Sequence, residues 1–162
     1  AIKNMVDSCE AKYYSKPHII MSGDLDLSSF IFPKELYLIR DKIVGYKCDY
    51  FPGNIIKHYN GRIEDIDIDA LIEARDRFIE DMKVLTEEGY FLYDLAGNLL
   101  FDNERLVAID TLDYIKRKVT LDENIVSLDF ALARQLKYHD QSTNIGVFDN
   151  FEEAIRKIKT RR

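Results

Sequence analysis

Three polar side chains, Asp94, Asn98 and Asp110, stand beside short apolar runs and have the residue types that bind divalent cations. Asp94 opens a polar loop at residues 94–98, and Asp110 follows an apolar run at residues 106–109. Carboxylate and amide oxygens suit Mg²⁺, which takes few protein ligands and keeps positions for water and phosphate. The chemistry that these residues indicate is the binding of a magnesium ion together with a phosphate group.

A β-hairpin is the element that must bring two of these side chains together. Two apolar runs flank the polar residues 102–105, whose composition is typical of a turn. A two-stranded hairpin returns the chain to its starting end. We therefore expect Asn98, just before the first strand, to lie beside Asp110, just after the second, with Asp94 close by. The alternative is that these Asp and Asn residues only form turns.

The stretch from Asp94 to Asp110 resembles the catalytic core of the protein-kinase-like superfamily, which includes small-molecule phosphotransferases. In that family a catalytic Asp, a metal-binding Asn, a hairpin and a metal-binding Asp follow one another. The string D-L-A-G-N-L-L at residues 94–100 is similar to the family's D-L-x-x-x-N-I-L. The resemblance implies that Asp94 is catalytic and that Asn98 and Asp110 hold Mg²⁺. Asp94 lies four positions before Asn98, where the family has five.

The resemblance extends to a nucleotide site upstream of the hairpin. Residues 48–53 look like the hinge that joins the two lobes of a kinase, because they follow two predicted strands and precede a long predicted helix. A hinge of this kind binds adenine through backbone groups. The resemblance implies that Asp49 and Phe51 supply those groups and that Cys48 lies beside the adenine. The alternative is an ordinary exposed hairpin that leads into a loop.

The first residues of the chain also resemble the family. Ala1-Ile2-Lys3 is similar to the end of the V-A-I-K strand, which would make Lys3 the phosphate-binding lysine and Glu10 its partner on a helix. Because the sequence starts at Ala1 without Met, we expect a fragment or a processed form, with any phosphate-covering strands upstream. The 7 glycines of this sequence show neither the G-x-G nor the G-x-x-x-x-G-K spacing of a phosphate loop.

Composition excludes several classes of protein. The 162 residues fit one domain or two small lobes, and 46% hydrophobic with 32% charged residues is ordinary for a soluble globular chain. A net charge of −6 argues against nucleic acid as a partner. No apolar run approaches the length of a membrane span. Two cysteines, Cys9 and Cys48, lie far apart without metal-site spacing, so we expect reduced thiols and a cytoplasmic location.

Periodicity and capping signals predict the other elements. Helices are expected at residues 3–15, at 68–88, after a capping box formed by Thr120 and Glu123, and after Asn150. Strands are expected at 36–39 and 43–51, joined as a hairpin, and at 91–93. In the kinase resemblance, Asn124 takes the place of an Asp that anchors the backbone of the catalytic loop.

The predicted elements indicate an α+β fold, and the resemblance implies that this fold is protein-kinase-like. Residues 1–53 would form a reduced N-terminal β part, and residues 54–162 a mainly helical part that carries the catalytic hairpin. One function is a phosphotransferase that binds ATP and Mg²⁺ and acts on a hydroxyl-bearing substrate. Another is a pseudokinase-like module that acts through a protein partner, which the short loop and the missing Gly-rich loop favour. A third alternative is an unrelated α+β domain.

Overall fold

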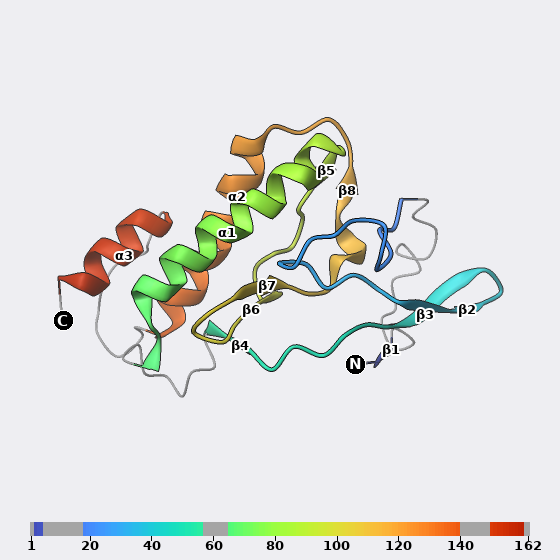
Figure 1. Cartoon of the computed structure of the whole chain (residues 1–162), viewed down its shortest axis with the longest axis horizontal. Helices are drawn as coiled ribbons and strands as arrows, with labels where there is room; N and C mark the ends of the chain where they lie inside the picture. The colour runs from blue at the N-terminus through green and yellow to red at the C-terminus, as the bar shows by residue number, and fades with distance from the viewer. Residues whose placement is uncertain (1, 5–17, 57–64, 140–149, 161–162) are drawn as a thin grey trace.

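The chain folds into an α+β structure, and the computed structural model describes residues 2–4, 18–56, 65–139 and 150–160 (Figure 1). In these residues, three α-helices gather at one end of the molecule and a small sheet projects at the other. The predicted α+β class is therefore confirmed.

Helix α1 (Ile68–Glu87) begins at the predicted residue and ends one residue before the predicted end, and both of its ends carry local signals. The side chain of Asp67 accepts the N–H of Ala70 at 2.9 Å and caps the first turn. Gly89 follows the helix with φ of 75°, the left-handed conformation that ends helices. The buried face consists of residues at helical spacing: Ile68, Leu71, Ala74, Phe78, Met82 and Leu85.

Helix α2 (Leu121–His139) begins with the predicted capping box. The hydroxyl of Thr120 accepts the N–H of Glu123 at 3.2 Å, and the Glu123 carboxylate accepts the N–H of Thr120 at 2.8 Å. Three of its apolar residues at helical spacing are fully buried: Leu128, Leu132 and Leu136. Ile125, nearer the start of the helix, is only partly buried.

Helix α3 (Phe151–Lys159) completes the helical end of the molecule and packs on α2. It starts at the predicted cap, Asn150, and buries an apolar side that includes Phe151, Ile155 and Ile158. Arg75 of α1 joins the three helices. Its guanidinium donates two hydrogen bonds to Asp129 of α2, at 2.7 and 2.9 Å, and lies 5.1 Å from the ring of Phe151.

The predicted hairpin at residues 35–51 forms, with β2 (Glu35–Ile39) and β3 (Lys42–Lys47) paired antiparallel. Its turn residues, Arg40 and Asp41, have φ of 49° and 62°, as a two-residue hairpin turn requires. The second strand is shorter than predicted, because the β2–β3 pairing ends where Lys47 faces Glu35. Residues 48–53 leave the sheet as a connecting segment.

Strand β1 (Ile2–Asn4) lies on the other side of β3, so the small sheet has the order β1-β3-β2. Lys3 is the register partner of Tyr46. The predicted helix at residues 3–15 is wrong at its start, because pairing with an existing strand satisfies the backbone there. The remainder of that prediction lies outside the described residues.

The hairpin predicted around residues 102–105 is confirmed as β6 (Leu99–Phe101) and β7 (Leu106–Ala108). Strand β4 (Asn54–Ile55), which follows the connecting segment, pairs with β6 on its other side. Alternate residues of the hairpin face the core, and each of them is at most 2% exposed: Leu99, Phe101, Leu106 and Ala108.

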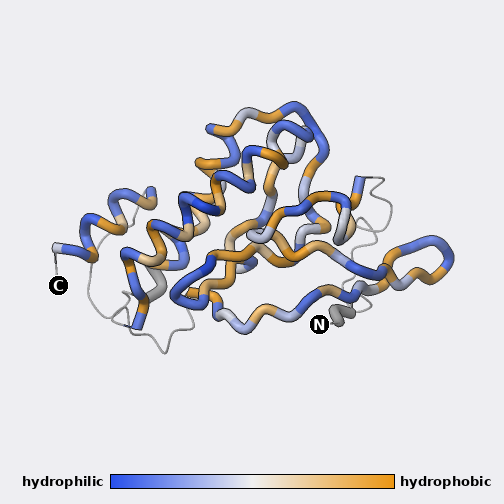
Figure 2. The backbone as a smooth tube through the Cα atoms, in the orientation of Figure 1, coloured by the Kyte–Doolittle hydropathy of each residue, from blue (hydrophilic) through white to orange (hydrophobic). Residues whose placement is uncertain are grey.

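A segment without regular structure extends this sheet at its β7 edge. The N–H of Ile31 donates to the carbonyl of Ala108 at 3.0 Å, and the N–H of Ala108 donates to the carbonyl of Ser29 at 2.8 Å. The ring of Phe30 lies 4.7 Å from that of Phe78 on α1, between ring centroids. Figure 2 shows the apolar stretches that meet here, along the hairpin and on α1.

The strand predicted at 91–93 is shorter than expected and starts one residue earlier. Strand β5 (Tyr90–Phe91) pairs with β8 (Ile115–Lys116), which follows a 3₁₀ turn at Thr111–Asp113. Strand β5 precedes β6 in the sequence and β8 follows β7. The pairing of β5 with β8 therefore brings together the chain segments on either side of the β6–β7 hairpin. The polar loop at residues 94–98 and Asp110 both lie between β5 and β8 in the sequence.

Candidate functional site

The backbone that leads into the 94–98 loop is fixed by a buried asparagine. Asn124 of α2 is 0% exposed, and its Oδ1 accepts the N–H of Leu92 at 3.0 Å. Its Nδ2 donates to the carbonyl of Tyr90 and to the hydroxyl of Thr86, both at 2.9 Å. As predicted, Asn124 contacts the backbone of this region. The loop therefore starts from a position that α1 and α2 hold.

The loop itself is closed by Asn98. The side-chain Nδ2 of Asn98 donates to the carbonyl of Asp94 at 2.8 Å, and its backbone N–H donates to the carbonyl of Leu95 at 3.0 Å. Asp94 has φ of 59° and an exposed side chain. A left-handed conformation is uncommon for residues other than glycine, although Asp tolerates it better than most. Because Nδ2 is the donor in this bond, Oδ1 is the atom of the Asn98 side chain that can act as an acceptor.

The hairpin brings Asn98 and Asp110 to the same end. The N–H of Ile109 donates to the carbonyl of Asn98 at 2.9 Å, directly after the paired residues Leu99 and Ala108. Asp110 follows Ile109 and has φ of 59°. Two non-glycine residues with left-handed backbone, Asp94 and Asp110, thus flank Asn98. Such conformations persist only where the surrounding structure imposes them, and they cluster at functional sites.

Tyr46 of β3 joins this end of the hairpin to the small sheet. Its hydroxyl donates to Oδ1 of Asp110 at 3.0 Å, and its side chain is 4% exposed. Burial, and then the charge of Asp110, raise the pKa of the Tyr46 phenol well above its usual value of about 10. Strand alternation carries no signal for this contact, because the two residues lie 64 positions apart in the sequence.

The candidate phosphate-binding lysine lies near this contact in the sheet. Lys3 of β1 is the register partner of Tyr46, whose hydroxyl reaches Asp110. Residues directly opposite in antiparallel strands lie about 4.5–5.5 Å apart. The structure thus brings Lys3, Tyr46 and Asp110 into one region, although they are far apart in the sequence. Glu10, the proposed partner of Lys3, lies outside the described residues.

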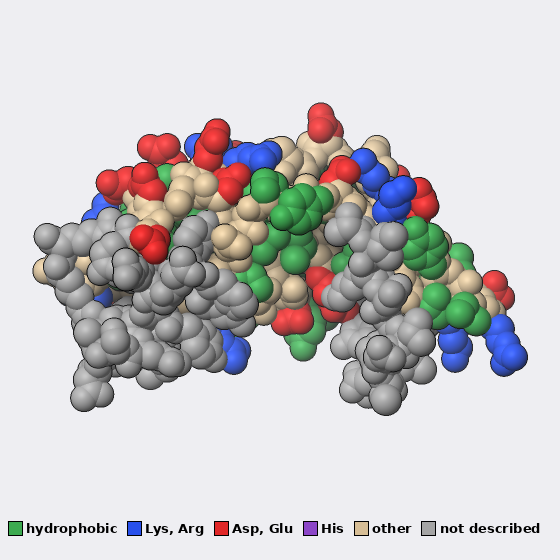
Figure 3. Space-filling model, turned by 90° about the horizontal axis from the view of Figure 1, so that it is seen from below, with side chains coloured by type: hydrophobic (Ala, Val, Ile, Leu, Met, Phe, Trp, Pro, Cys, Tyr) green, Lys and Arg blue, Asp and Glu red, His purple; other side chains and the backbone are tan. Residues whose placement is uncertain are grey.

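The connecting segment contains the three residues predicted to contact adenine. Cys48 is half-buried, Asp49 is exposed and pairs with Lys34 at 2.7 Å, and Phe51 is 6% exposed beneath the guanidinium of Arg105. Gly53 must be glycine, because a Cβ there would lie 2.3 Å from the Phe51 ring. Figure 3 views the molecule from below and shows apolar side chains near the middle of this face, with acidic groups beside them.

A cavity of about 560 Å³ opens between the connecting segment, residues 22–32 and β7. Asp49, Phe51 and Val107 are among its described lining residues, whereas Asn98 and Asp110 are not. Its volume falls in the range of small-molecule pockets. The structure therefore brings two of the predicted adenine contacts to one hollow and the predicted metal ligands to the end of the hairpin.

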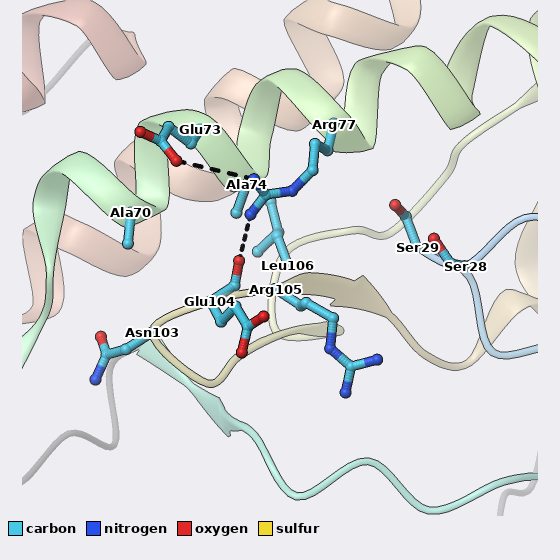
Figure 4. Close-up of a pocket in the computed structure, with 10 residues that line it drawn as sticks. All are labelled: Ser28, Ser29, Ala70, Glu73, Ala74, Arg77, Asn103, Glu104, Arg105 and Leu106. Atoms are coloured by element: carbon cyan, nitrogen blue, oxygen red, sulfur yellow. Dashed lines mark hydrogen bonds and ion pairs between the residues drawn. The ribbon is translucent and has the colours of Figure 1, made fainter.

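A second cavity, of about 550 Å³, lies between α1 and the turn of the β6–β7 hairpin (Figure 4). Arg77 donates to the carbonyl of Glu104 at 2.5 Å and lies 3.9 Å from the carboxylate of Glu73. In Figure 4 the side chain of Arg105 points away from that of Arg77. Because two arginines that diverge and two nearby glutamates give no convergent positive site, we assign this cavity no ligand.

Tyr114 is a second phenol close to Asp110. It is 6% exposed, and its hydroxyl has no hydrogen-bond partner among the residues that the structure describes. Burial, and then the charge of Asp110, raise the pKa of Tyr114 well above its usual value. Sequence analysis did not single out Tyr114. A buried hydroxyl without a hydrogen-bond partner costs free energy. Tyr114 differs in this respect from Tyr46, whose hydroxyl donates to the Asp110 carboxylate.

The end of the hairpin carries an amide and a carboxylate, which are types of oxygen donor that Mg²⁺ takes. Within residues 2–4, 18–56, 65–139 and 150–160, no group of three or more His, Cys, Asp or Glu side chains could hold a metal. The amide of Asn98 and the carboxylate of Asp110 form a smaller set. Mg²⁺ is commonly bound by one or two carboxylates together with substrate phosphates, rather than by a complete protein cage.

Comparison of this sequence with protein-family models gives no match, and comparison with curated proteins gives none either. In the part of the chain that the structure describes, no helix has both the length and the apolar composition needed to cross a membrane. The functional argument therefore depends on the geometry of the site.

Proposed function

We propose that this chain is a protein-kinase-like protein that binds ATP with Mg²⁺ and transfers a phosphoryl group to a hydroxyl acceptor. The observation that supports this proposal is the hairpin β6–β7, which carries Asn98 and Asp110 at one end. The order of elements also supports it, because a long helix, a polar loop, a hairpin and an Asp follow one another as in that family.

In this proposal the two metal ligands act on the charge of the nucleotide. Asn98 and Asp110 hold Mg²⁺, which neutralises negative charge on the transferred phosphoryl group. Lys3 adds a positive charge to the phosphates, from a strand that lies opposite Tyr46. Such electrostatic stabilisation, together with positioning, accounts for most of the catalysis in phosphoryl transfer.

The other predicted residues act on the adenine of ATP and on the acceptor hydroxyl. Cys48, Asp49 and Phe51 bind the adenine end of ATP, in keeping with the hollow that borders the connecting segment. Asp94 accepts the proton of the acceptor hydroxyl as that oxygen bonds to the γ-phosphorus, the bond from this phosphorus to the bridging oxygen breaks, and ADP leaves. Its exposed side chain and its position in the loop closed by Asn98 favour this role.

Thermal unfolding with and without ATP and Mg²⁺ tests the binding step. At 100 times its dissociation constant, a ligand stabilises the folded state by about 2.7 kcal/mol, and for a chain of this size that raises Tm by roughly 5–10 °C. Asp110→Ala should abolish the shift. Asp102→Asn, at the opposite end of the same hairpin, should retain it. No shift in the wild type, or an equal shift in Asp110→Ala, would refute the proposal.

A pseudokinase-like module that acts through a protein partner is the second candidate. The observation that favours it is the short loop, in which Asp94 lies four residues before Asn98 and has a left-handed backbone. Phosphoryl transfer that is lost in Asp94→Asn would select the enzyme. Binding of ATP without any transfer would select the module, and transfer that survives Asp94→Asn would exclude Asp94 as the base.

A further inference from the structure

We propose that Tyr46 is a positioning residue for the metal ligand Asp110, an inference that rests on the proposed Mg²⁺–ATP site. The Tyr46 hydroxyl donates to Oδ1 of Asp110 at 3.0 Å. Tyr46 belongs to the small sheet and Asp110 to the end of the β6–β7 hairpin. The metal site is therefore built jointly by two parts of the molecule, and its geometry depends on how the small sheet is seated.

The donor is held in place by its surroundings. Tyr46 lies on the central strand of the small sheet, where Lys3 is its register partner on β1 and Leu36 its partner on β2. Its side chain is 4% exposed, so the ring has little room to change rotamer. The position of the hydroxyl is consequently set by the strand, and the hydroxyl in turn fixes the orientation of the Asp110 carboxylate.

The chemistry of a carboxylate allows this role. A carboxylate can accept a hydrogen bond on one oxygen while the other binds a metal. A neutral hydroxyl fixes the rotation of the group without placing a positive charge that would compete with the cation. Outer partners of this kind orient metal ligands, and their loss typically lowers metal affinity by about 10- to 100-fold. The opposite view, in which Tyr46 blocks the metal, predicts tighter binding when the hydroxyl is removed.

Tyr114 provides a matched control within the same chain. Its phenol is also buried and also lies close enough to Asp110 for the charge of that carboxylate to raise its pKa. Among the described residues, however, its hydroxyl has no hydrogen-bond partner. Replacing either tyrosine by phenylalanine removes one oxygen from a buried ring. Only the change at Tyr46 removes a hydrogen bond to the proposed metal ligand.

The experiment measures the affinity of the full chain for ATP by calorimetry, once with excess Mg²⁺ and once with EDTA. The ratio of the two affinities reports the contribution of the metal. Tyr46→Phe should lower this ratio by about 10- to 100-fold, or to unity if the wild-type ratio is smaller, and leave the affinity in EDTA unchanged. Tyr114→Phe should leave both values unchanged. In the double variant Tyr46→Phe/Asp110→Asn, the ratio should equal that of Asp110→Asn alone.

The outcomes separate this inference from the proposed function. A wild-type chain whose ATP affinity does not depend on Mg²⁺ would refute both. A wild-type dependence that Tyr46→Phe preserves or strengthens would overturn the role of Tyr46 and leave the metal site intact. An equal loss in Tyr114→Phe would also overturn it, because the effect would then come from packing of the ring.

A measurement on the wild type covers the case in which Tyr46→Phe does not fold. Carbon-13 labelling of tyrosine places a signal at the phenol carbon of Tyr46, which reports its hydrogen bond. Adding Mg²⁺ to the chain saturated with ATP should shift this signal, while those of the exposed Tyr37 and Tyr50 stay in place. An unchanged Tyr46 signal, with binding of Mg²⁺–ATP shown by calorimetry, would overturn the proposal.

Discussion

The hairpins β2–β3 and β6–β7 have similar sequence patterns, two apolar runs around a polar turn, yet the molecule holds them very differently. The first projects from one end of the molecule (Figure 1). Leu38 and Ile39, next to its turn, are each 58% exposed. Its turn residues, Arg40 and Asp41, adopt left-handed backbone conformations. The shape of this hairpin therefore comes mainly from its own strand pairing and turn.

The second hairpin is fixed by contacts from outside. Its turn is held by Asp102, whose carboxylate accepts the N–H groups of Glu104 at 3.0 Å and Arg105 at 2.6 Å. Asn103 extends the restraint to the start of α1, because its Oδ1 accepts the N–H of Asp67 at 3.0 Å. The core face of the strands is buried against α1.

This difference supports placing the proposed site at the end of β6–β7. A side chain can orient a ligand only if its backbone is held within a fraction of an ångström, and rigid packed elements supply that. The first hairpin contributes where it touches the second, through the bond from Tyr46 to Asp110. The two hairpins should therefore respond very differently to matched substitutions.

Phe101→Ala should have the largest effect. Phe101 of β6 is 0% exposed, and truncation of a buried Phe typically costs about 3–5 kcal/mol of stability. Leu38→Ala, on the projecting hairpin, should change stability by less than about 0.5 kcal/mol because its side chain is 58% exposed. Urea unfolding followed by circular dichroism measures both. Equal costs would show that the two hairpins are held alike.

Asn124→Leu should have the next largest effect. The change removes the hydrogen bonds to Leu92 and Tyr90 and leaves two buried backbone groups without these partners. At about 1–2 kcal/mol for each group, the loss should be roughly 2–4 kcal/mol. The exposed Asn54→Ala serves as the control, with little change expected.

Hydrogen exchange separates this effect from a general loss of packing. The amide of Leu92, which donates to Asn124, should exchange faster in Asn124→Leu than the decrease in global stability explains. Amides of the β2–β3 hairpin should follow global stability alone. If Leu92 exchanges no faster than those amides, the anchoring role of Asn124 is wrong.

The parts of the fold that could be predicted are those with local signals. The bounds of α1 followed from a cap at Asp67, a helical apolar period and Gly89 at its end. The capping box of α2 could be predicted from Thr120 and Glu123. The β6–β7 hairpin, and with it the meeting of Asn98 and Asp110 at one end, followed from apolar runs around a polar turn.

The parts that could not be predicted depend on contacts between distant segments. Strand β3 ends at Lys47 because its partner β2 begins at Glu35, although the alternating pattern continues beyond it. Ser29 and Ile31 join the edge of β7 through backbone groups, which leave no trace in residue type. The same holds for Tyr46, because the fold alone brings its hydroxyl to Asp110.

Changes in the two turns should have smaller effects of opposite sign. Asp102→Ala removes the carboxylate that accepts two backbone N–H groups and should cost about 1–2 kcal/mol. Asp41→Gly should stabilise by up to about 1 kcal/mol, because glycine adopts its φ of 62° without the steric cost of a Cβ. Thermal unfolding measures both, and a loss of stability in Asp41→Gly would contradict this account of the turn.

Between pH 10 and 11, a buried phenol should lower the free energy of unfolding by about 1 kcal/mol, whereas an exposed phenol should leave it unchanged. Burial raises the pKa of Tyr114 in the folded state, whereas in the unfolded chain a tyrosine releases its proton near pH 10. Above pH 10 the folded state therefore binds more protons than the unfolded state, so stability falls as pH rises. For one such tyrosine the loss between pH 10 and 11 is about 1 kcal/mol.

Tyr114→Phe should remove the loss of stability between pH 10 and 11 that comes from the Tyr114 phenol. At pH 7 the variant should be as stable as the wild type or slightly more stable, because it deletes a buried hydroxyl that has no partner among the described residues. Tyr50→Phe, at a ring that is 77% exposed, should leave the decline between pH 10 and 11 as it is in the wild type. Urea unfolding at pH 7, 10 and 11 measures all three proteins. A Tyr114→Phe curve parallel to the wild type would mean that the Tyr114 phenol reaches solvent, and that the surroundings of Asp110 are more open than the contacts of Tyr46 imply.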